Sequence, residues 1–128
     1  MPATDLDAER VRDADRFATS GVFRSDRMKV VCGYFEPGQF IPVHAPDSDV
    51  AIVVQSGSGV VREGETDRPV APGDLVVVEA GTARGVKASD GERLEAVLVT
   101  APPPTDAEHE PVREGIRRGT FDPREGSE

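Results

Sequence analysis

Short runs of β-branched residues, each closed by turn-forming residues, recur through the centre of the chain and constrain its fold most strongly. The runs lie at residues 28–35, 40–44, 50–55, 59–62, 75–79, 84–88 and 94–100. Glycine, proline, serine and aspartate fill the gaps between them, as they do in turns, and no helical period intervenes. About seven or eight strands at spacings of about 8–12 residues predict an all-β fold, an antiparallel sandwich or barrel.

One domain of residues 21–101 holds these runs, and more polar segments flank it on both sides. The length of 128 residues fits a single domain. Residues 1–20 form a charged N-terminal arm, in which Asp5 offers a helix N-cap ahead of acidic residues. A short helix and an extended arm are both open for this segment.

The C-terminal extension, residues 102–128, opens with three prolines that cannot continue a central strand. Val112, Ile116 and Phe121 predict a short helix that begins near Pro111 and docks one side onto the barrel. The residues after Phe121 are predicted to be disordered. The extension is therefore expected to be partly helical or disordered.

The formal net charge of −9, from 24 acidic and 15 basic residues, argues against nucleic acids and anionic membranes as partners, because phosphate groups need a positive field. The acidic residues are spread along the chain, which favours a role in solubility over a docking patch. Lysine occurs only at positions 29 and 87. A halophilic origin would select such an acidic, lysine-poor surface, but a GC-rich genome also favours arginine over lysine, and both origins stay open.

Cys32 is the single cysteine, so no intrachain disulfide can form. It lies in an apolar run, which predicts a buried and inert thiol. No apolar stretch is long enough to span a bilayer, and the first ten residues lack the basic start and apolar run of a signal peptide. We expect a cytoplasmic protein that does not bind membranes.

Two spaced motifs with framework glycines organise the centre of the chain. In the first, Gly38 is followed by QFIPV and then by His44, and Gly57 closes the motif. In the second, Gly73 is followed by DLVVV and then by EAG. The pattern resembles the two conserved motifs of the cupin superfamily, and the resemblance covers residues 28–101.

The resemblance implies a cupin-type double-stranded β-helix, a jelly-roll barrel in which a His-x-His pair, a glutamate and a third histidine hold a divalent transition metal. The paired histidines work together because residues two apart on a strand face the same side. Here only His44 matches, and Pro46, Val50 and Arg84 occupy the other three positions. Proline and valine do not ligate metals, and arginine is permanently positive. We therefore expect no metal cofactor, since such sites need about three protein ligands.

Neighbouring carboxylates are the alternative source of metal ligands. Asp47 and Asp49 lie between the motif positions, so His44, Asp47 and Asp49 form a candidate metal set. Glu79 stands at the end of the second-motif strand. Turning Asp49 inward would need a strand shift of one residue, which would also turn the neighbouring Val50 away from the interior.

His44 and Arg84, with Glu79 and Asp49 beside them, form the candidate ligand-binding site, and no catalytic residue is assigned. His44 could act as a base, line the pocket, or simply be satisfied by hydrogen bonds within the barrel. If Arg84 points into the barrel it needs an anionic partner, because a buried unpaired guanidinium is costly. Glu79, Glu63 or Asp49 would give a structural pair, and the carboxylate or phosphate of a ligand is the other option.

Three functions follow from these alternatives. The favoured one is a metal-independent module that binds a small polar or anionic metabolite. The second is a metal-dependent enzyme of the dioxygenase or isomerase type, with substitute ligands near His44. The third is a structural or assembly role with a filled barrel. The resemblance, together with the tendency of small barrels to pair their exposed edges, also predicts a homodimer formed through an edge strand or the terminal arms.

Overall fold

The computed structural model describes residues 3–124, and strands are their main secondary structure. The strands are β1 Ala18–Arg24, β2 Lys29–Phe35, β3 Phe40–His44, β4 Asp49–Gly57, β5 Gly59–Glu63, β6 Thr66–Val70, β7 Leu75–Val78, β8 Arg84–Ala88 and β9 Leu94–Ala101. The helical elements are α1 Leu6–Glu9, the 3-10 helix η1 Ala107–His109 and α2 Glu110–Arg118. The prediction of a disordered tail from residue 122 is wrong at its start, because Asp122 is buried and accepts hydrogen bonds from Arg62 and Arg124. Residues 125–128 lie outside the described residues.

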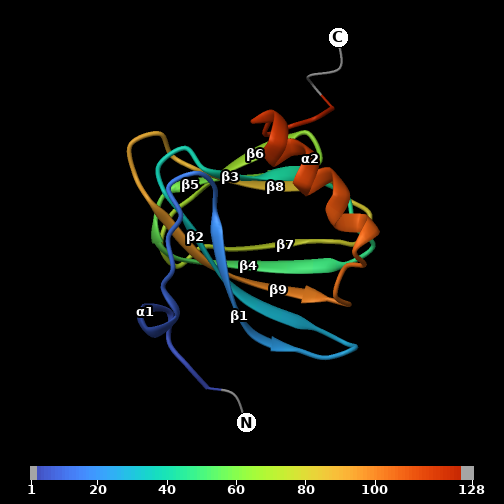
Figure 1. The fold of residues 1–128 in the computed structure, drawn as a ribbon, viewed down its shortest axis with the longest axis horizontal. Coiled ribbons are helices and arrows are strands. Elements are labelled where there is room, and N and C mark those ends of the chain that lie inside the picture. The colour runs from blue at the N-terminus through green and yellow to red at the C-terminus, as the bar shows by residue number, and fades with distance from the viewer. Residues whose placement is uncertain (1–2, 125–128) are drawn as a thin grey trace.

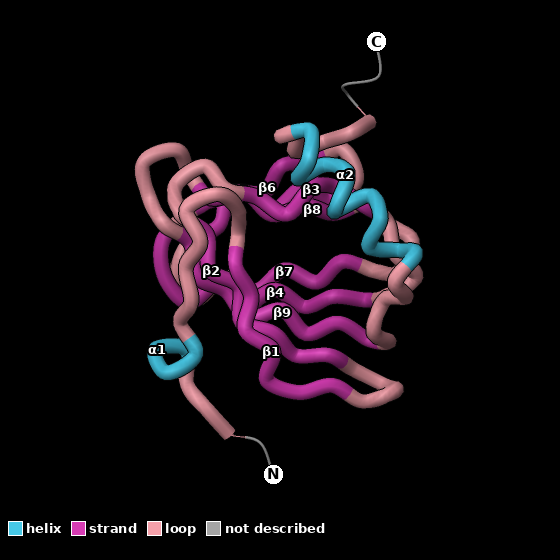
Figure 2. The backbone as a smooth tube through the Cα atoms, viewed as in Figure 1, coloured by secondary structure: helices cyan, strands magenta, loops and turns pink. Residues whose placement is uncertain are grey.

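Two antiparallel sheets face each other and enclose the interior (Figures 1 and 2). The five-stranded sheet has the order β1-β2-β9-β4-β7, and the four-stranded sheet has the order β3-β8-β5-β6. Neighbouring strands in each sheet are mostly far apart in the sequence, as the jelly-roll arrangement requires. The predicted all-β barrel is confirmed.

Two strands, β1 and β6, were not predicted, and both lie at sheet edges. β6 is mostly exposed and polar, and it pairs only with β5, in a hairpin that turns at Gly64. Its Pro69 lacks an N–H group, which an edge strand tolerates. Neither strand carries the apolar run on which the prediction relied.

The core lies between the two sheets and reaches α2, whose Val112 belongs to it. Phe35, Val54 and Leu94 are almost fully buried there, and the ring of Phe17 stacks on that of Phe35 with centroids 5.8 Å apart. Gly57 has a positive φ of 83°, and a Cβ at this position would lie 1.7 Å from the carbonyl oxygen of Arg93, just before the neighbouring strand β9. The close approach of the two backbones explains why a framework glycine is required here.

Helix α2 docks on the four-stranded sheet beside β3 (Figure 1). A Cβ at Gly115 would lie only 2.4 Å from the Pro42 side chain, so the helix backbone packs directly on the strand. Val112 is buried, and the ring of Phe121 meets that of Phe40 edge to face. The predicted docking helix is therefore confirmed. No helix in the described part of the chain is long and apolar enough to cross a membrane.

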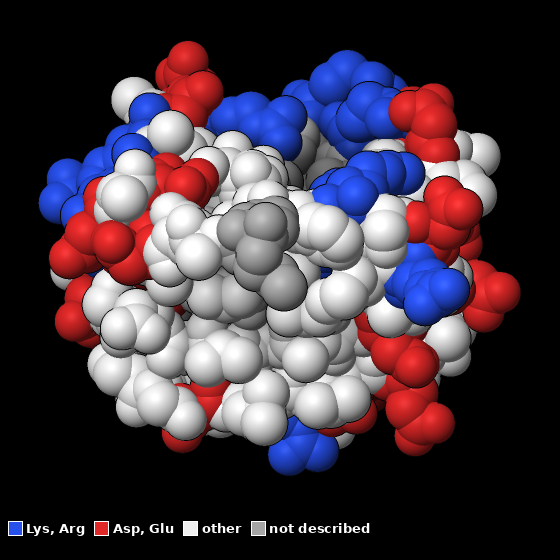
Figure 3. Space-filling model, turned by 90° about the horizontal axis from the view of Figure 1, so that it is seen from below, with Lys and Arg blue, Asp and Glu red and all other residues white. Residues whose placement is uncertain are grey.

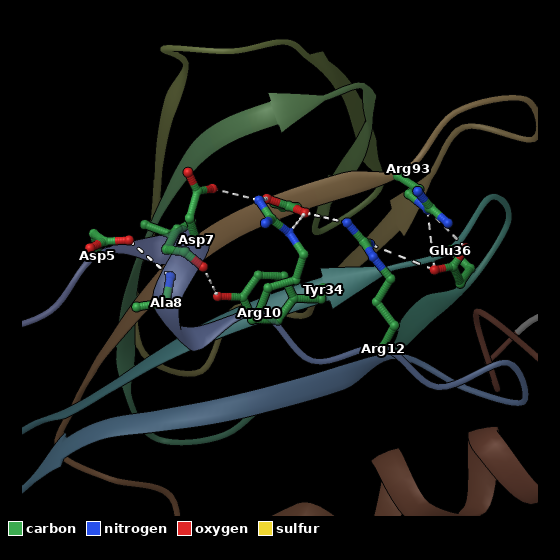
Figure 4. Close-up of polar contacts among 10 residues, drawn as sticks. Asp5, Asp7, Ala8, Arg10, Arg12, Tyr34, Glu36 and Arg93 are labelled. Carbon is green, nitrogen blue, oxygen red and sulfur yellow. Dashed lines mark hydrogen bonds and ion pairs between the residues drawn. The ribbon is translucent and has the colours of Figure 1, made fainter.

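The N-terminal residues 5–12, called the strap below, lie along the outer face of the five-stranded sheet (Figure 4). Glu95, on the outward side of β9, accepts hydrogen bonds at 2.7 Å from Arg10 Nε and from an Nη of Arg12. The hydroxyl of Tyr34 donates to the carbonyl oxygen of Leu6 at 2.7 Å. These contacts leave Glu95 and Tyr34 buried although both point away from the barrel interior.

Candidate ligand-binding pocket

A cavity of about 290 Å³ opens between the two sheets, at the barrel end next to η1 and α2. Strands of both sheets line it, and His109, Val112 and Arg113 close one side of it from the C-terminal extension. The barrel is therefore not packed solid. A filled interior, which the third functional alternative required, is not what the structure contains.

The outer layer of the pocket consists of residues that face one another across the barrel end. On the five-stranded sheet, Thr100 pairs with both Lys29 and Val50. On the four-stranded sheet, His44 pairs with Arg84. All five side chains line the cavity. The motif positions His44, Val50 and Arg84 thus converge on one site, as the spacing of the two motifs predicted.

The inner layer lies one step further into the barrel and is entirely apolar. Leu98 pairs with Val31 and Ile52 on the five-stranded sheet, two residues along each strand from the outer layer. Ile41 pairs with Val86 on the four-stranded sheet. These five side chains also line the cavity. Side chains two apart share a face and stack the two layers on β2, β4, β8 and β9, whereas on β3 a register shift lies between Ile41 and His44.

Arg84 is 4% exposed and is held by backbone groups rather than by a carboxylate. Its Nε donates to the carbonyl oxygen of Thr82 at 3.0 Å, and one Nη donates to that of Glu79 at 2.9 Å. The structural ion pair with the side chain of Glu79, Glu63 or Asp49 is therefore not formed within the described residues. Burial lowers the pKa of Arg84, and the more distant charge of Asp49 opposes this shift.

His44 is neutral at neutral pH. Burial, together with the positive charge of Arg84, lowers its pKa to about 4, although the hydrogen bond to Pro42 opposes the shift. Its Nδ1 lies 2.9 Å from the carbonyl oxygen of Pro42. Because a carbonyl only accepts, Nδ1 carries the proton and Nε2 keeps the lone pair. His44 therefore adds a polar group to the pocket without adding charge.

The acidic candidates from the sequence lie outside the cavity lining. The backbone N–H of Asp47 donates to the carboxylate of Glu108 at 2.7 Å, and the carboxylate of Asp49 accepts from the backbone N–H of Ala80 at 2.8 Å. Glu79 contacts Arg84 through its backbone carbonyl oxygen and not through its carboxylate. In the described part of the chain, no three His, Cys, Asp or Glu side chains form a group that could hold a metal ion. The set of His44, Asp47 and Asp49 is not assembled.

Four cationic or imidazole side chains that line the pocket were missed from the sequence, namely Arg16, Lys29, His109 and Arg113. Lys29 could have been identified from the sequence. It lies on a predicted strand, six residues from the buried Phe35, and therefore faces the same side. His109 and Arg113 belong to the extension, whose docking was predicted but whose contribution to the pocket was not. Arg16 precedes a strand that the sequence did not reveal.

The pocket has a positive electrostatic environment. Burial lowers the pKa of Lys29, and the charge of Arg24 adds to the effect. Burial also lowers the pKa of His109, with Lys29 and Arg113 adding to the shift and Asp106 opposing it. No aspartate or glutamate occurs among the described residues that line the cavity. Further positive charge is therefore disfavoured there, and negative charge is favoured.

Comparison with known proteins gives one family. Residues 33–100 match the model of the cupin domain. TT1209 from Thermus thermophilus is 32% identical, with a TM-score of 0.77 over 81% of this chain and 100% of that one. An RmlC-like cupin protein from Desulfovibrio desulfuricans is also 32% identical, with a TM-score of 0.69 over 80% of this chain and 98% of that one.

A third similar structure supports the fold alone. It is a conserved protein with a double-stranded β-helix domain from Klebsiella pneumoniae, 24% identical, with a TM-score of 0.72 over 78% of this chain and 89% of that one. No curated protein matches the sequence. The matched family region ends at residue 100, before the extension that closes one side of the pocket.

Proposed function

The chain belongs to the cupin domain family, and we propose that its barrel pocket binds a small anionic metabolite without a metal ion. The fold alone does not select an activity, since this barrel is a scaffold whose function depends on the site it carries. The proposal therefore rests on the side chains of the pocket.

The observation that carries the proposal is the sign of the charge inside the pocket. A chain of net charge −9 lines this cavity with Arg16, Lys29 and Arg84 and, among its described residues, with no carboxylate. The hydrogen bonds of the buried Arg84 go to neutral carbonyls. An anion that enters the pocket would meet Lys29 and Arg84, which are already positioned and partly desolvated, and this strengthens the attraction.

The donor set at the family's metal positions supports a metal-independent mode of binding. Of His44, Pro46, Val50 and Arg84, only the histidine can ligate, whereas cupin metal sites of the expected kind use about three protein ligands. The guanidinium of Arg84 would also repel a cation at the same place. We therefore assign His44 and Arg84 to ligand binding.

Calorimetric titration of the EDTA-treated protein tests the proposal, with inorganic phosphate, acetate and benzoate as probes. We expect at least one of these anions to bind, and Arg84→Gln or Lys29→Gln to weaken it about tenfold or more, because each removes a charge-assisted hydrogen bond. Arg68→Gln, which changes an exposed arginine outside the pocket, should leave the affinity unchanged.

Two results would overturn the proposal. One is that none of the probes binds, or that binding is indifferent to both pocket substitutions. The other is a near-stoichiometric transition metal in the purified protein that is lost, together with binding, in His44→Ala. Lys29 is only partly buried and is not in the core, so Lys29→Gln keeps the test valid if Arg84→Gln fails to fold.

A further inference from the structure

The two layers of the pocket differ in chemistry and have a fixed order. The outer layer carries Lys29, His44 and Arg84, and the inner layer consists of aliphatic side chains, while the exposed Arg16 and Thr19 line the cavity outside both layers. A ligand that carried charge throughout would have to leave the inner layer unfilled or place charge against it, and both are unfavourable. An uncharged apolar ligand would leave the cations without a partner.

The size of the cavity limits the apolar part of a ligand. An apolar cavity of about 150 Å³ is known to accept benzene, and this one measures about 290 Å³. It therefore has room for one ring, or a short alkyl chain, together with a charged head group. It does not approach the upper end, about 1,000 Å³, of pockets for larger ligands.

The C-terminal extension adds groups to the head-group end of the cavity. His109 lies at the end of η1, and Arg113 lies on the first turns of α2, where it also pairs with Glu110 and Asp106. Direct packing of Gly115 on the four-stranded sheet fixes the position of this helix. The extension thus contributes to recognition from outside the region that matches the family model.

We propose that the ligand is an amphipathic organic anion, with a ring-sized or short-chain apolar body in the inner layer and its anionic head among Lys29, Arg84 and His109. This inference rests on the proposed function and specifies its ligand class. It also makes the extension a determinant of specificity, because His109 and Arg113 meet only the head-group end of the pocket.

The test compares matched probes in the EDTA-treated full-length protein by calorimetric titration. Acetate and phosphate offer a head alone, benzamide and hexanamide offer a body alone, and benzoate, hexanoate and phenyl phosphate offer both. Each buried methylene contributes about fourfold in affinity. We expect hexanoate and benzoate to bind at least tenfold more tightly than acetate and than their own amides. Comparison of phenyl phosphate with benzoate shows whether the site prefers a phosphate or a carboxylate head group.

Two substitutions assign the parts of the ligand to the two layers. Val31→Phe fills the inner layer and should weaken hexanoate severalfold while leaving acetate unchanged. His109→Gln should weaken benzoate severalfold while leaving benzamide unchanged. Arg117→Gln, on the same helix but outside the cavity lining, is the control and should change neither.

The outcomes separate the two proposals. If acetate or phosphate binds as tightly as hexanoate and benzoate, the amphipathic ligand is wrong while anion binding stands. If the His109→Gln and Arg117→Gln proteins bind benzoate equally well, the role of the extension is wrong. If no anion binds, the proposed function itself fails.

Discussion

Glu95 is a single carboxylate that joins the strap to the five-stranded sheet. Its side chain lies on the outer face of β9 and is only 5% exposed, because Arg10 and Arg12 cover it (Figure 4). Hydrogen bonds from Arg10, followed by those from Arg12, lower the pKa of Glu95 below its usual value of 4.5. Folding therefore favours the ionised form of this group.

Glu95→Gln should lower the free energy of unfolding at neutral pH by about 1–3 kcal/mol, since it removes charge-assisted hydrogen bonds from a buried acceptor. A carboxyl group with a lowered folded-state pKa stabilises the fold above its unfolded pKa, and this contribution is lost as the pH falls through the folded pKa. The difference between wild type and variant should therefore shrink in acid. Urea unfolding of both proteins at pH 7 and at about pH 3 measures it. A difference that stays constant or grows in acid would contradict the role of the ion pair.

Helix α2 is the element that links the extension to the pocket. Gly115 lies in its middle, where alanine would normally favour a helix by about 1 kcal/mol over glycine. Here a Cβ would meet the Pro42 side chain at 2.4 Å and 2.6 Å, so the packing conflict should outweigh the gain in propensity.

Gly115→Ala should lower the thermal stability and expose the extension to proteolysis, with a loss of about 1–3 kcal/mol. Glu114→Ala, at the neighbouring position and partly exposed, is the matched control and should change stability by less than about 0.5 kcal/mol. Thermal unfolding and limited proteolysis report the two effects. A Gly115→Ala protein as stable as wild type would show that the helix does not pack directly on β3.

Secondary structure could be predicted where burial leaves a pattern in the sequence. The strands at Phe40–His44 and Arg84–Ala88 were predicted with the bounds that the structure has. β6 was missed because Asp67, Arg68 and Pro69 face solvent at an edge and give no apolar alternation. Helix α2 was predicted from Pro111 and the spacing of Val112 and Ile116, whereas Phe121, also used in that prediction, lies beyond the helix and packs on Phe40.

The homodimer expected from the sequence stays a prediction, and one face of the whole molecule suits it. Leu75, Val77 and Val53 point outward side by side on β7 and β4, with exposed fractions of 62%, 56% and 37%. In the view from below, uncharged residues fill much of the surface and most charged residues lie towards its rim (Figure 3). Two copies that each carry −9 repel one another least where charge is absent. β7 is also the last strand of its sheet, so a second copy could pair with it.

Light scattering coupled to size-exclusion chromatography tests this arrangement. We expect a dimer for the wild-type chain and a monomer for the double variant Leu75→Glu and Val77→Glu, which places charge at the centre of the contact. Thr66→Glu introduces charge at an exposed position of β6, in the other sheet, and should remain dimeric. A wild-type chain that elutes as a monomer would rule out the interface.

The site was predictable only where the two motifs fix positions on the strands. Their resemblance to the cupin motifs implied that His44 and Arg84 share one pocket, and both line the cavity. The hydrogen-bond partners of Arg84 could not be predicted from the sequence. They are backbone carbonyl oxygens, which every residue has. The net charge gave no warning of a basic pocket either. It sums over the whole surface, whereas the pocket depends on a few inward positions.

Tyr34 gives the protein a built-in optical reporter of the strap. It is the single tyrosine in a chain without tryptophan, so the near-ultraviolet fluorescence of the folded protein comes from this phenol. The ring lies beneath the strap, its hydroxyl bound to the Leu6 carbonyl, and burial raises its pKa well above the usual value. Release of the strap would change the emission and let the phenol ionise at lower pH. Detachment of eight N-terminal residues could then be followed without any added label.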